Sequence, residues 1–283
     1  MRRILLAAMV FGAVTAARAA DLPDLPILRG SVGNGLSSSA VNWGGFYIGG
    51  QAGYGSSDEN FNGNNQSLTA TMLANTVIER ELGVSRWPLN LGKTTGHTTA
   101  YGAFTGYNWQ WDDVVVGLEA SYMHGSFGGT SSASMRRFFS APLSDGFFHD
   151  ITSNASSSIA ISDMATFRAR AAYSYGSFLP YMFGGFALGN ADITRSVSVV
   201  DRFATFAPPF PTVCPTVGPP FCFTPSLTSA QHNRLIYGYT AGLGVDVNLI
   251  GGLFLRAEWE YIRFTSAVDT SINTVRAGIG YKF

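Results

Sequence analysis

The sequence predicts an all-β protein, an eight-stranded antiparallel up-and-down transmembrane β-barrel with long extracellular loops and short periplasmic turns. Two-faced segments of about 12–16 residues recur eight times along the chain. Short and long connections alternate between these segments. Beyond the first thirty residues, no apolar run approaches the ~20 residues that a membrane-spanning helix needs, so a chain that crosses a bilayer must do so as a closed barrel.

The amino terminus has the features of an export signal. Arg2 and Arg3 precede an apolar run from Ile4 to Ala17 and a small-x-small triplet that ends at Ala19. This order is typical of a secretory signal peptide. We therefore assign residues 1–20 to a signal peptide, the Pro-, Gly- and Ser-rich residues 21–42 to a flexible periplasmic lead-in, and residues 43–283 to the barrel.

The eight strands are predicted from runs in which apolar and polar or small residues alternate. They lie near 43–56, 97–111, 114–126, 160–175, 179–191, 233–248, 253–265 and 270–283. Tight turns are expected at Asp112–Asp113, from Tyr175 to Phe178 and from Asn248 to Gly252. Long loops are expected from Ser57 to Gly96, from Phe127 to Ile159 and from Asp192 to His232, with a short fourth from Ser266 to Asp269. A soluble β-sandwich, the alternative fold, has little reason to gather its long loops at one end.

The alternation also assigns the two faces of the wall. In the last strand Val275, Ala277 and Ile279 share an apolar face with Tyr281 and Phe283, while Arg276 and Lys282 share the other face. Most other strands repeat this rule, so the charges fall on the lumen side. Only the strand at 179–191 is ambiguous, because Phe183 and Phe186 fall on opposite faces of this strand.

The charges on the lumen side form the first candidate site. They are Glu119, Arg168, Arg170, Asp246, Arg256, Glu258, Glu260, Arg276 and Lys282. An eight-stranded barrel is only just wide enough for side chains, which favours a salt-bridged plug. The alternative is a small gated pore whose charges select solutes.

Aromatic residues gather where the predicted strands reach the short turns. Rings with an apolar body and a polar tip favour the membrane interface, so we expect these side chains to form an interfacial belt. The belt comprises Trp43, Phe46, Tyr47, Trp109, Trp111, Tyr173, Tyr175, Tyr181 and Phe283.

Other reactive residues give weaker signals. Cys214 and Cys222 lie in a Pro-rich segment and predict one local disulfide rather than a metal site. The four histidines, His97, His124, His149 and His232, all fall at the long-loop end, which leaves haem or metal capture open, but they show no ligand spacing. His124-Gly125-Ser126 resembles the His-x-Ser of outer-membrane lipid A deacylases, although the sequence identifies no carboxylate partner. We expect no cofactor, no metal and no enzymatic activity.

Both ends of the mature chain carry a resemblance to a known family. Ala20-Asp21-Leu22-Pro23, the run from Asn42 to Gly50 (NWGGFYIGG) and the ending VRAGIGYKF at 275–283 resemble the alphaproteobacterial outer-membrane immunogenic proteins, which are small porin-family barrels with an OmpA-like β-barrel domain. The resemblance implies a Gram-negative outer membrane, delivery by periplasmic chaperones and insertion by the barrel-assembly machinery, which would read Tyr281 and Phe283 at the end of the last strand.

These observations together predict a structural role. The barrel is expected to contribute to envelope integrity and to display surface loops, with outer-membrane lipid and lipopolysaccharide as its partners. The alternatives are, in order, a small passive porin, surface haemin binding and lipid A modification. The 18 basic and 18 acidic residues give no charge field that would recruit nucleic acid.

Overall fold

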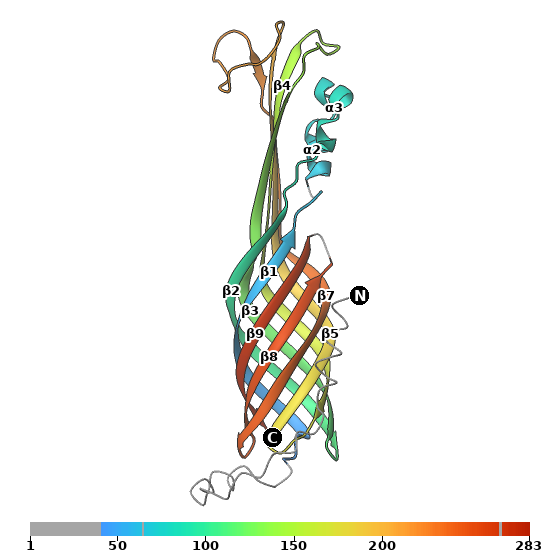
Figure 1. Ribbon diagram of the computed structural model, residues 1–283, viewed down its shortest axis with the longest axis vertical. Helices are drawn as coiled ribbons and strands as arrows, with labels where there is room; N and C mark the ends of the chain where they lie inside the picture. Colours follow the sequence, from blue (N-terminus) through green and yellow to red (C-terminus); the bar gives the residue numbers. More distant parts are fainter. Residues whose placement is uncertain (1–40, 64, 266–267) are drawn as a thin grey trace, which may run out of the picture. The chain divides into compact units, whose positions relative to one another are not determined.

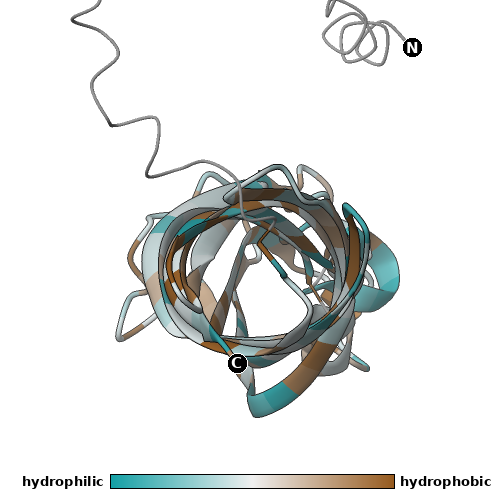
Figure 2. Cartoon of the chain, turned by 90° about the horizontal axis from the view of Figure 1, so that it is seen from below, coloured by the Kyte–Doolittle hydropathy of each residue, from teal (hydrophilic) through white to brown (hydrophobic). Residues whose placement is uncertain are grey.

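The computed structural model describes residues 41–63, 65–265 and 268–283. Eight of its nine strands close an antiparallel ring in which each strand pairs with its neighbours in the chain and β1 pairs with β9 (Figure 1). The ring strands are β1 (Gly45–Asn60), β2 (Lys93–Trp111), β3 (Val114–Phe138), β4 (Phe148–Tyr173), β5 (Phe178–Ala204), β7 (Ser226–Ile250), β8 (Leu253–Phe264) and β9 (Asp269–Lys282). Seen from below, the strands surround one axis (Figure 2). The predicted fold class is confirmed. The predicted signal peptide and lead-in residues 21–40 lie outside the described residues.

The three tight turns are confirmed, and each contains a residue with positive φ. Asp112 has φ 50°, Gly176 has φ 58° and Gly251 has φ 61°. A two- to four-residue connection between antiparallel strands needs this backbone conformation to match the twist of the strands. These residues therefore set the short-turn end of the barrel.

Two of the predicted long loops are mostly strand. β3 and β4 stay paired as far as Phe138 and Asp150, so only residues 139–147 connect them. β5 and β7 likewise extend the pairing from Ile193–Gln231 to Ser198–Ser226. The prediction was wrong because Ser, Thr and Asn alternate here with small apolar residues. Such residues are typical of loops. They nevertheless form a sheet when apolar side chains from another part of the chain pack against one of its faces.

A row of β-bulges separates the barrel from these extensions. The register shifts between His124 and Phe127, between Ile161 and Asp163, and between Ala191 and Ile193. Above this row β3, β4, β5 and β7 form a four-stranded sheet. We call this sheet, together with residues 61–63, 65–92, 139–147 and 205–225, the lobe.

The first long connection folds onto one face of the lobe sheet. It contains α2 (Gln66–Met72), α3 (Val77–Leu82) and the 3₁₀ helix η2 (Val84–Arg86). Thr76 caps α3 by accepting the backbone N–H of Glu79 at 3.2 Å. The lobe thus has a core of its own, which contains Leu73, Ile78, Val84, Trp87, Ile151 and Val199. None of the helices among the described residues is long and apolar enough to cross a membrane.

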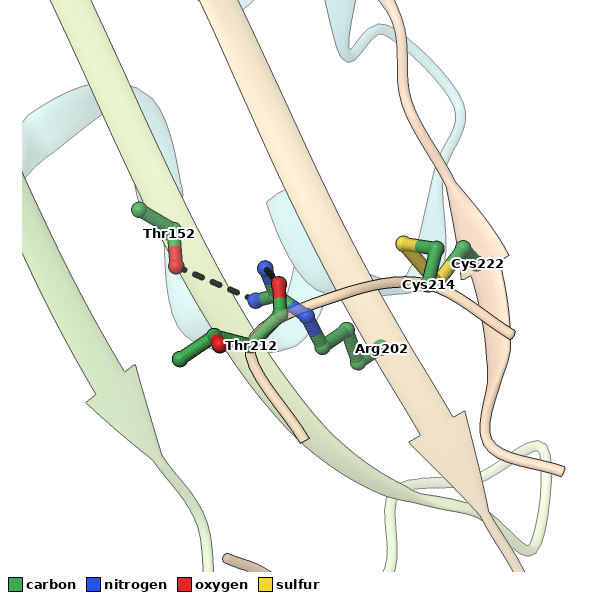
Figure 3. Close-up of a disulfide and its surroundings, with 5 residues drawn as sticks. All are labelled: Thr152, Arg202, Thr212, Cys214 and Cys222. Atoms are coloured by element: carbon green, nitrogen blue, oxygen red, sulfur yellow. Dashed lines mark hydrogen bonds between the residues drawn. A yellow bond between two sulfur atoms is a disulfide. The ribbon is translucent and has the colours of Figure 1, made fainter. Parts of the chain in front are cut away.

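The third long connection is tied back to the sheet. A disulfide joins Cys214 to Cys222, and the short strand β6 (Phe221–Phe223) pairs with the end of β5. The guanidinium of Arg202 donates to the Thr152 hydroxyl at 3.3 Å and to the Thr212 carbonyl at 2.6 Å (Figure 3). These contacts hold the Pro-rich segment against β4 and β5.

Candidate functional site

The lumen of the barrel holds a closed network of charged side chains. Each member has 0–2% of its side chain exposed. The network comprises the carboxylates of Glu119, Asp246, Glu258 and Glu260 and the guanidinium groups of Arg168, Arg170, Arg256 and Arg276. Four negative charges therefore face four positive charges.

Glu119 on β3 is the central acceptor. Arg168 donates to its Oε1 through Nε at 2.9 Å, and Arg170 donates to Oε2 at 3.1 Å. Arg256 reaches both carboxylate oxygens from the opposite wall, at 3.0 and 2.9 Å, and the Tyr47 hydroxyl donates at 2.6 Å. Residues that are far apart in the sequence thus meet because strands on opposite sides of a narrow ring project into one space.

The remaining carboxylates extend the network in both directions along the axis. Asp246 accepts from Arg170 at 2.7 Å and from Nε of Arg256 at 2.8 Å. Glu258 accepts both terminal nitrogens of Arg168, at 2.7 and 2.8 Å.

Glu260 and Arg276 form the end of the network toward the lobe. Glu260 accepts the Thr240 hydroxyl at 2.7 Å and pairs with Arg276. Arg276 also lies 3.7 Å from Glu258 and donates from Nε to the Thr274 hydroxyl at 3.1 Å. Every charged group in the network has an opposite charge beside it, so no buried charge is left without a countercharge.

Lys282 was predicted as a ninth member, but the structure does not bring it into the network. Its Nζ lies 3.4 Å from the Gly44 carbonyl at the short-turn mouth. The side chain shares the lumen face with Arg276 but reaches the mouth, where it is only partly buried.

Aromatic rings line the network, and this corrects part of the predicted interfacial belt. Trp43, Tyr47 and Tyr181 are 3%, 1% and 5% exposed and lie inside the barrel, whereas the other six belt residues are exposed on its outer surface. The guanidinium of Arg170 lies 3.9 Å from the ring centroid of Tyr181, and that of Arg256 lies 3.9 Å from the ring centroid of Phe104. The prediction failed for these three residues because it considered only their distance from the short turns. It did not consider the face of the strand to which each side chain points.

The ambiguous strand is also resolved. In β5, Leu179, Tyr181 and Phe183 point inward, and Met182 and Phe186 point outward. Arg168 lies 4.1 Å from the ring centroid of Phe183, so this ring belongs to the wall of the charge network.

Glycines on neighbouring strands make room for the inward rings. An added Cβ at Gly106 would lie 2.4 Å from the Tyr47 hydroxyl, and one at Gly244 would lie 2.4 Å from the Tyr181 ring. Three further ring and glycine pairs follow the same pattern: Phe104 with Gly49, Phe183 with Gly242, and Phe254 with Gly280. The glycines of the strands therefore allow large rings to fill a narrow lumen.

Apolar layers close the lumen on both sides of the charges. Toward the short turns, Val115, Leu179 and Phe254 pack with Trp43. Toward the lobe, a larger cluster contains Met123, Phe127, Ile236, Ile262 and Phe264. At the short-turn mouth, the space between Trp43, Asp246 and Lys282 leaves no room for a water molecule. Side chains thus pack across the lumen at the charge network and on both sides of it.

The histidines do not form a joint site. His97, His124 and His232 lie near the bulge row on the outside of the wall, and His149 is buried in the lobe. No group of three or more His, Cys, Asp or Glu residues in the described ranges is arranged to hold a metal ion. His124 does have a carboxylate partner that the sequence did not reveal, since its Nδ1 lies 2.8 Å from Asp163 Oδ1. Within the described ranges no hydrogen bond joins His124 to Ser126.

His149 is held between two carboxylates in the lobe. Its Nδ1 lies 3.0 Å from Asp201, and its Nε2 lies 3.1 Å from Asp145 Oδ2. Burial opposes the charged imidazolium, but the bonds and charges of Asp201 and Asp145 outweigh burial and raise the pKa of His149 above its ordinary value. This contact fixes the connection between β3 and β4 to β5.

Comparisons with known proteins agree with this architecture. The family model described as outer membrane protein beta-barrel domain matches residues 4–283. A curated relative, the 25 kDa outer-membrane immunogenic protein of Brucella ovis, is 24% identical over 182 residues, which cover 64% of this chain and 62% of the relative. The chain thus spans less than two thirds of the length of that relative.

Three solved structures are among those similar to this chain. The attachment invasion locus protein Ail of Yersinia pestis is 14% identical, with 85% of this chain and 99% of that chain covered and a TM-score of 0.30. Neisserial surface protein A is 13% identical, with 84% and 97% covered and a TM-score of 0.33. The N-terminal β-barrel domain of OprF from Pseudomonas aeruginosa is 11% identical, with 84% and 99% covered and a TM-score of 0.33.

Proposed function

Since this chain belongs to the outer membrane protein beta-barrel domain family and is located in the outer membrane, we propose that it is a structural, non-conducting barrel that stabilises the envelope and displays its lobe at the cell surface. Lipopolysaccharide and outer-membrane lipid are its proposed partners in the membrane. Periplasmic chaperones and the barrel-assembly machinery are its proposed partners during biogenesis.

The observation that carries the proposal is the filled, charge-balanced lumen. A hydrated ion could pass only by displacing arginines from their carboxylates, and breaking a buried ion pair costs about 3–5 kcal/mol. Apolar layers around Phe254 and Phe127 lie on both sides of the charges. A barrel wall cross-linked from Glu119 on β3 to Arg256 on β8 also resists deformation.

The surface of the lobe supports the proposed display. Its exposed sheet face carries a regular array of short hydroxyl and amide side chains, such as Ser132 on β3, Ser156 and Asn154 on β4, and Ser196 and Ser198 on β5. The hydroxyl and amide side chains of this array are uncharged and can be hydrated.

The place of Tyr281 and Phe283 supports the proposed assembly signal. Both rings lie on the outer face at the seam where β9 meets β1, with 5.1 Å between their centroids. The Phe283 backbone N–H donates to the Phe46 carbonyl at 2.9 Å. These residues are thus accessible to a partner that guides the closing of the ring.

Conductance tests the proposal directly. We expect the purified, refolded protein in planar bilayers to show no steady conductance, while the same sample migrates differently on gels before and after boiling. A variant that removes the central carboxylate together with one seal, Glu119→Ala with Phe254→Ala, should raise conductance, whereas Leu255→Ala on the outer face should not. Steady large conductance of the wild-type barrel would establish the passive porin instead.

A further inference from the structure

The outer surface of the barrel contains an apolar groove that the sealed lumen does not explain. It has a volume of about 580 Å³ and crosses β1 to β5. This volume lies within the roughly 300–1,000 Å³ of sites that hold a small organic molecule. Its outward-facing lining consists of Phe46, Thr105, Tyr107, Leu118, Ala120, Phe167, Ala169, Gly184 and Phe186.

Small side chains form the floor of the groove, and aromatic rings form its walls. Ala169 pairs with Gly184, and Thr105 pairs with Ala120. Phe167 and Phe186, which are 53% and 74% exposed, stand beside this floor. The groove is therefore a depression in the wall and not a gap between loops.

The fold does not require a glycine at position 184. An added Cβ there would meet only the Thr240 carbonyl, at the ordinary contact distance of 3.7 Å, and Gly184 does not have a positive φ. The next residue differs, because a Cβ at Gly185 would lie 2.0 Å from the Phe167 carbonyl. Backbone packing thus explains Gly185, while the absence of a side chain at Gly184 keeps the groove open.

The groove is continuous with the lipid-facing surface and rises from the short-turn end. The register places Phe46, Tyr107, Leu118, Ala169 and Gly184 in one row across five strands. Phe46 is the second residue of β1 and touches the ring of Phe283, whereas Gly184 is six residues above the first residue of β5. Short turns of outer-membrane barrels face the periplasm, so the low end of the row lies at the periplasmic leaflet.

We propose that this groove binds one acyl chain of a glycerophospholipid from the periplasmic leaflet. The chain enters beside Phe46 and lies over Ala169 and Gly184 between the aromatic walls. Inside a membrane the hydrophobic effect does not favour this contact, so binding rests on van der Waals packing in a shaped surface. The inference depends on the membrane location and is independent of the sealed lumen.

Photo-crosslinking tests the inference. The full protein is reconstituted in vesicles of phosphatidylethanolamine and phosphatidylglycerol that contain a fraction of phosphatidylethanolamine with a diazirine on its acyl chain, and cross-linked peptides are mapped by mass spectrometry. We expect lipid adducts to concentrate on the groove strands β3 to β5. Gly184→Leu should reduce these adducts roughly threefold or more, because its side chain fills the floor. Ala277→Leu, an outward substitution on β9, should leave them unchanged.

Three outcomes would overturn the inference. They are adducts spread evenly around the ring, adducts that Gly184→Leu leaves unchanged, and cross-links from the groove to a second copy of the chain. Heat-dependent gel migration checks that each variant is folded. If Gly184→Leu does not insert, Ala169→Leu fills the same floor and replaces it. Conductance of the wild-type protein would contradict the proposed function without touching this inference.

Discussion

Replacing Glu119 by alanine removes the one carboxylate that three arginines of the lumen share. Arg168 keeps Glu258, and both Arg170 and Arg256 keep Asp246. The network then holds four buried guanidinium groups against three carboxylates, so one positive charge is left in excess. The Tyr47 hydroxyl also loses its acceptor.

The expected cost follows from this imbalance. Removing one partner of a buried ion pair destabilises a protein by about 3–5 kcal/mol. Glu119→Gln keeps the size of the side chain and one acceptor oxygen, so it should cost less. The double variant Glu119→Ala with Arg256→Ala restores neutrality, so its loss of unfolding free energy should be smaller than the sum of the two single losses by at least about 1 kcal/mol.

Reversible urea unfolding of the barrel refolded in phospholipid vesicles, followed by tryptophan fluorescence, measures these differences. Ser132→Ala, on the exposed face of the lobe, serves as the control and should stay within about 0.5 kcal/mol of wild type. The reasoning is refuted if Glu119→Ala unfolds within about 1 kcal/mol of wild type, or if the double variant loses the full sum.

Three further predictions concern the outer wall and the lobe. Ala257→Arg puts a charge on the lipid-facing side of β8 and should cost about 2–4 kcal/mol in the same titration, while Ala230→Arg on the exposed lobe should cost little; equal costs would contradict the assigned membrane band. The raised pKa of His149 means that its stabilisation of the lobe is complete below the ordinary pKa of about 6.5 and is lost as the pH rises through the folded pKa. Hydrogen-exchange protection of residues 139–147, corrected for intrinsic rates, should therefore fall over this range in the wild type and not in His149→Ala. Replacing Cys214 and Cys222, eight positions apart, by serine should destabilise their segment by about 2 kcal/mol and increase protease cleavage at 205–220, with heat-dependent gel migration unchanged.

The barrel was predictable because the two faces of its wall meet different environments, apolar lipid outside and a polar lumen inside. Lipid excludes charge from one face of every strand, so Arg256, Glu258 and Glu260 had to share the other face, and their facing follows from parity alone. The contacts among them were not predictable. Whether Arg256 contacts Glu119 depends on which strands lie across the ring from each other. The distance between two side chains across the barrel cannot be read from the sequence.

The lobe was missed because its strands are stabilised by another segment of the chain. Ser157 and Ser131 read as loop residues, yet they belong to a sheet whose inner face is covered by the first long connection. One local signal was present. Thr76 and Glu79 have the spacing of a capping box, and Gly83 follows at the carboxy end of the same short helix. Its six residues are too few for a clear hydrophobic period, so tertiary packing decides this helix.

The misplaced aromatic residues could have been assigned correctly from β1 itself. Gln51 is buried, and its amide donates to the Ser121 hydroxyl at 2.7 Å. A polar amide belongs on the lumen face, and Tyr47 has the same parity as Gln51, so Tyr47 must point inward even though it lies close to the short-turn end. The face of the strand on which an aromatic residue lies is therefore a better guide to its environment than its distance from the turn.

The inward-facing rings also explain the glycines of the lumen face. A narrow lumen has room for the Tyr47 ring only if the paired residue on the neighbouring strand has no side chain, and Gly106 is that residue. A regular set of glycines on the lumen face of a small barrel thus predicts a lumen filled with aromatic rings, which is the opposite of an open pore.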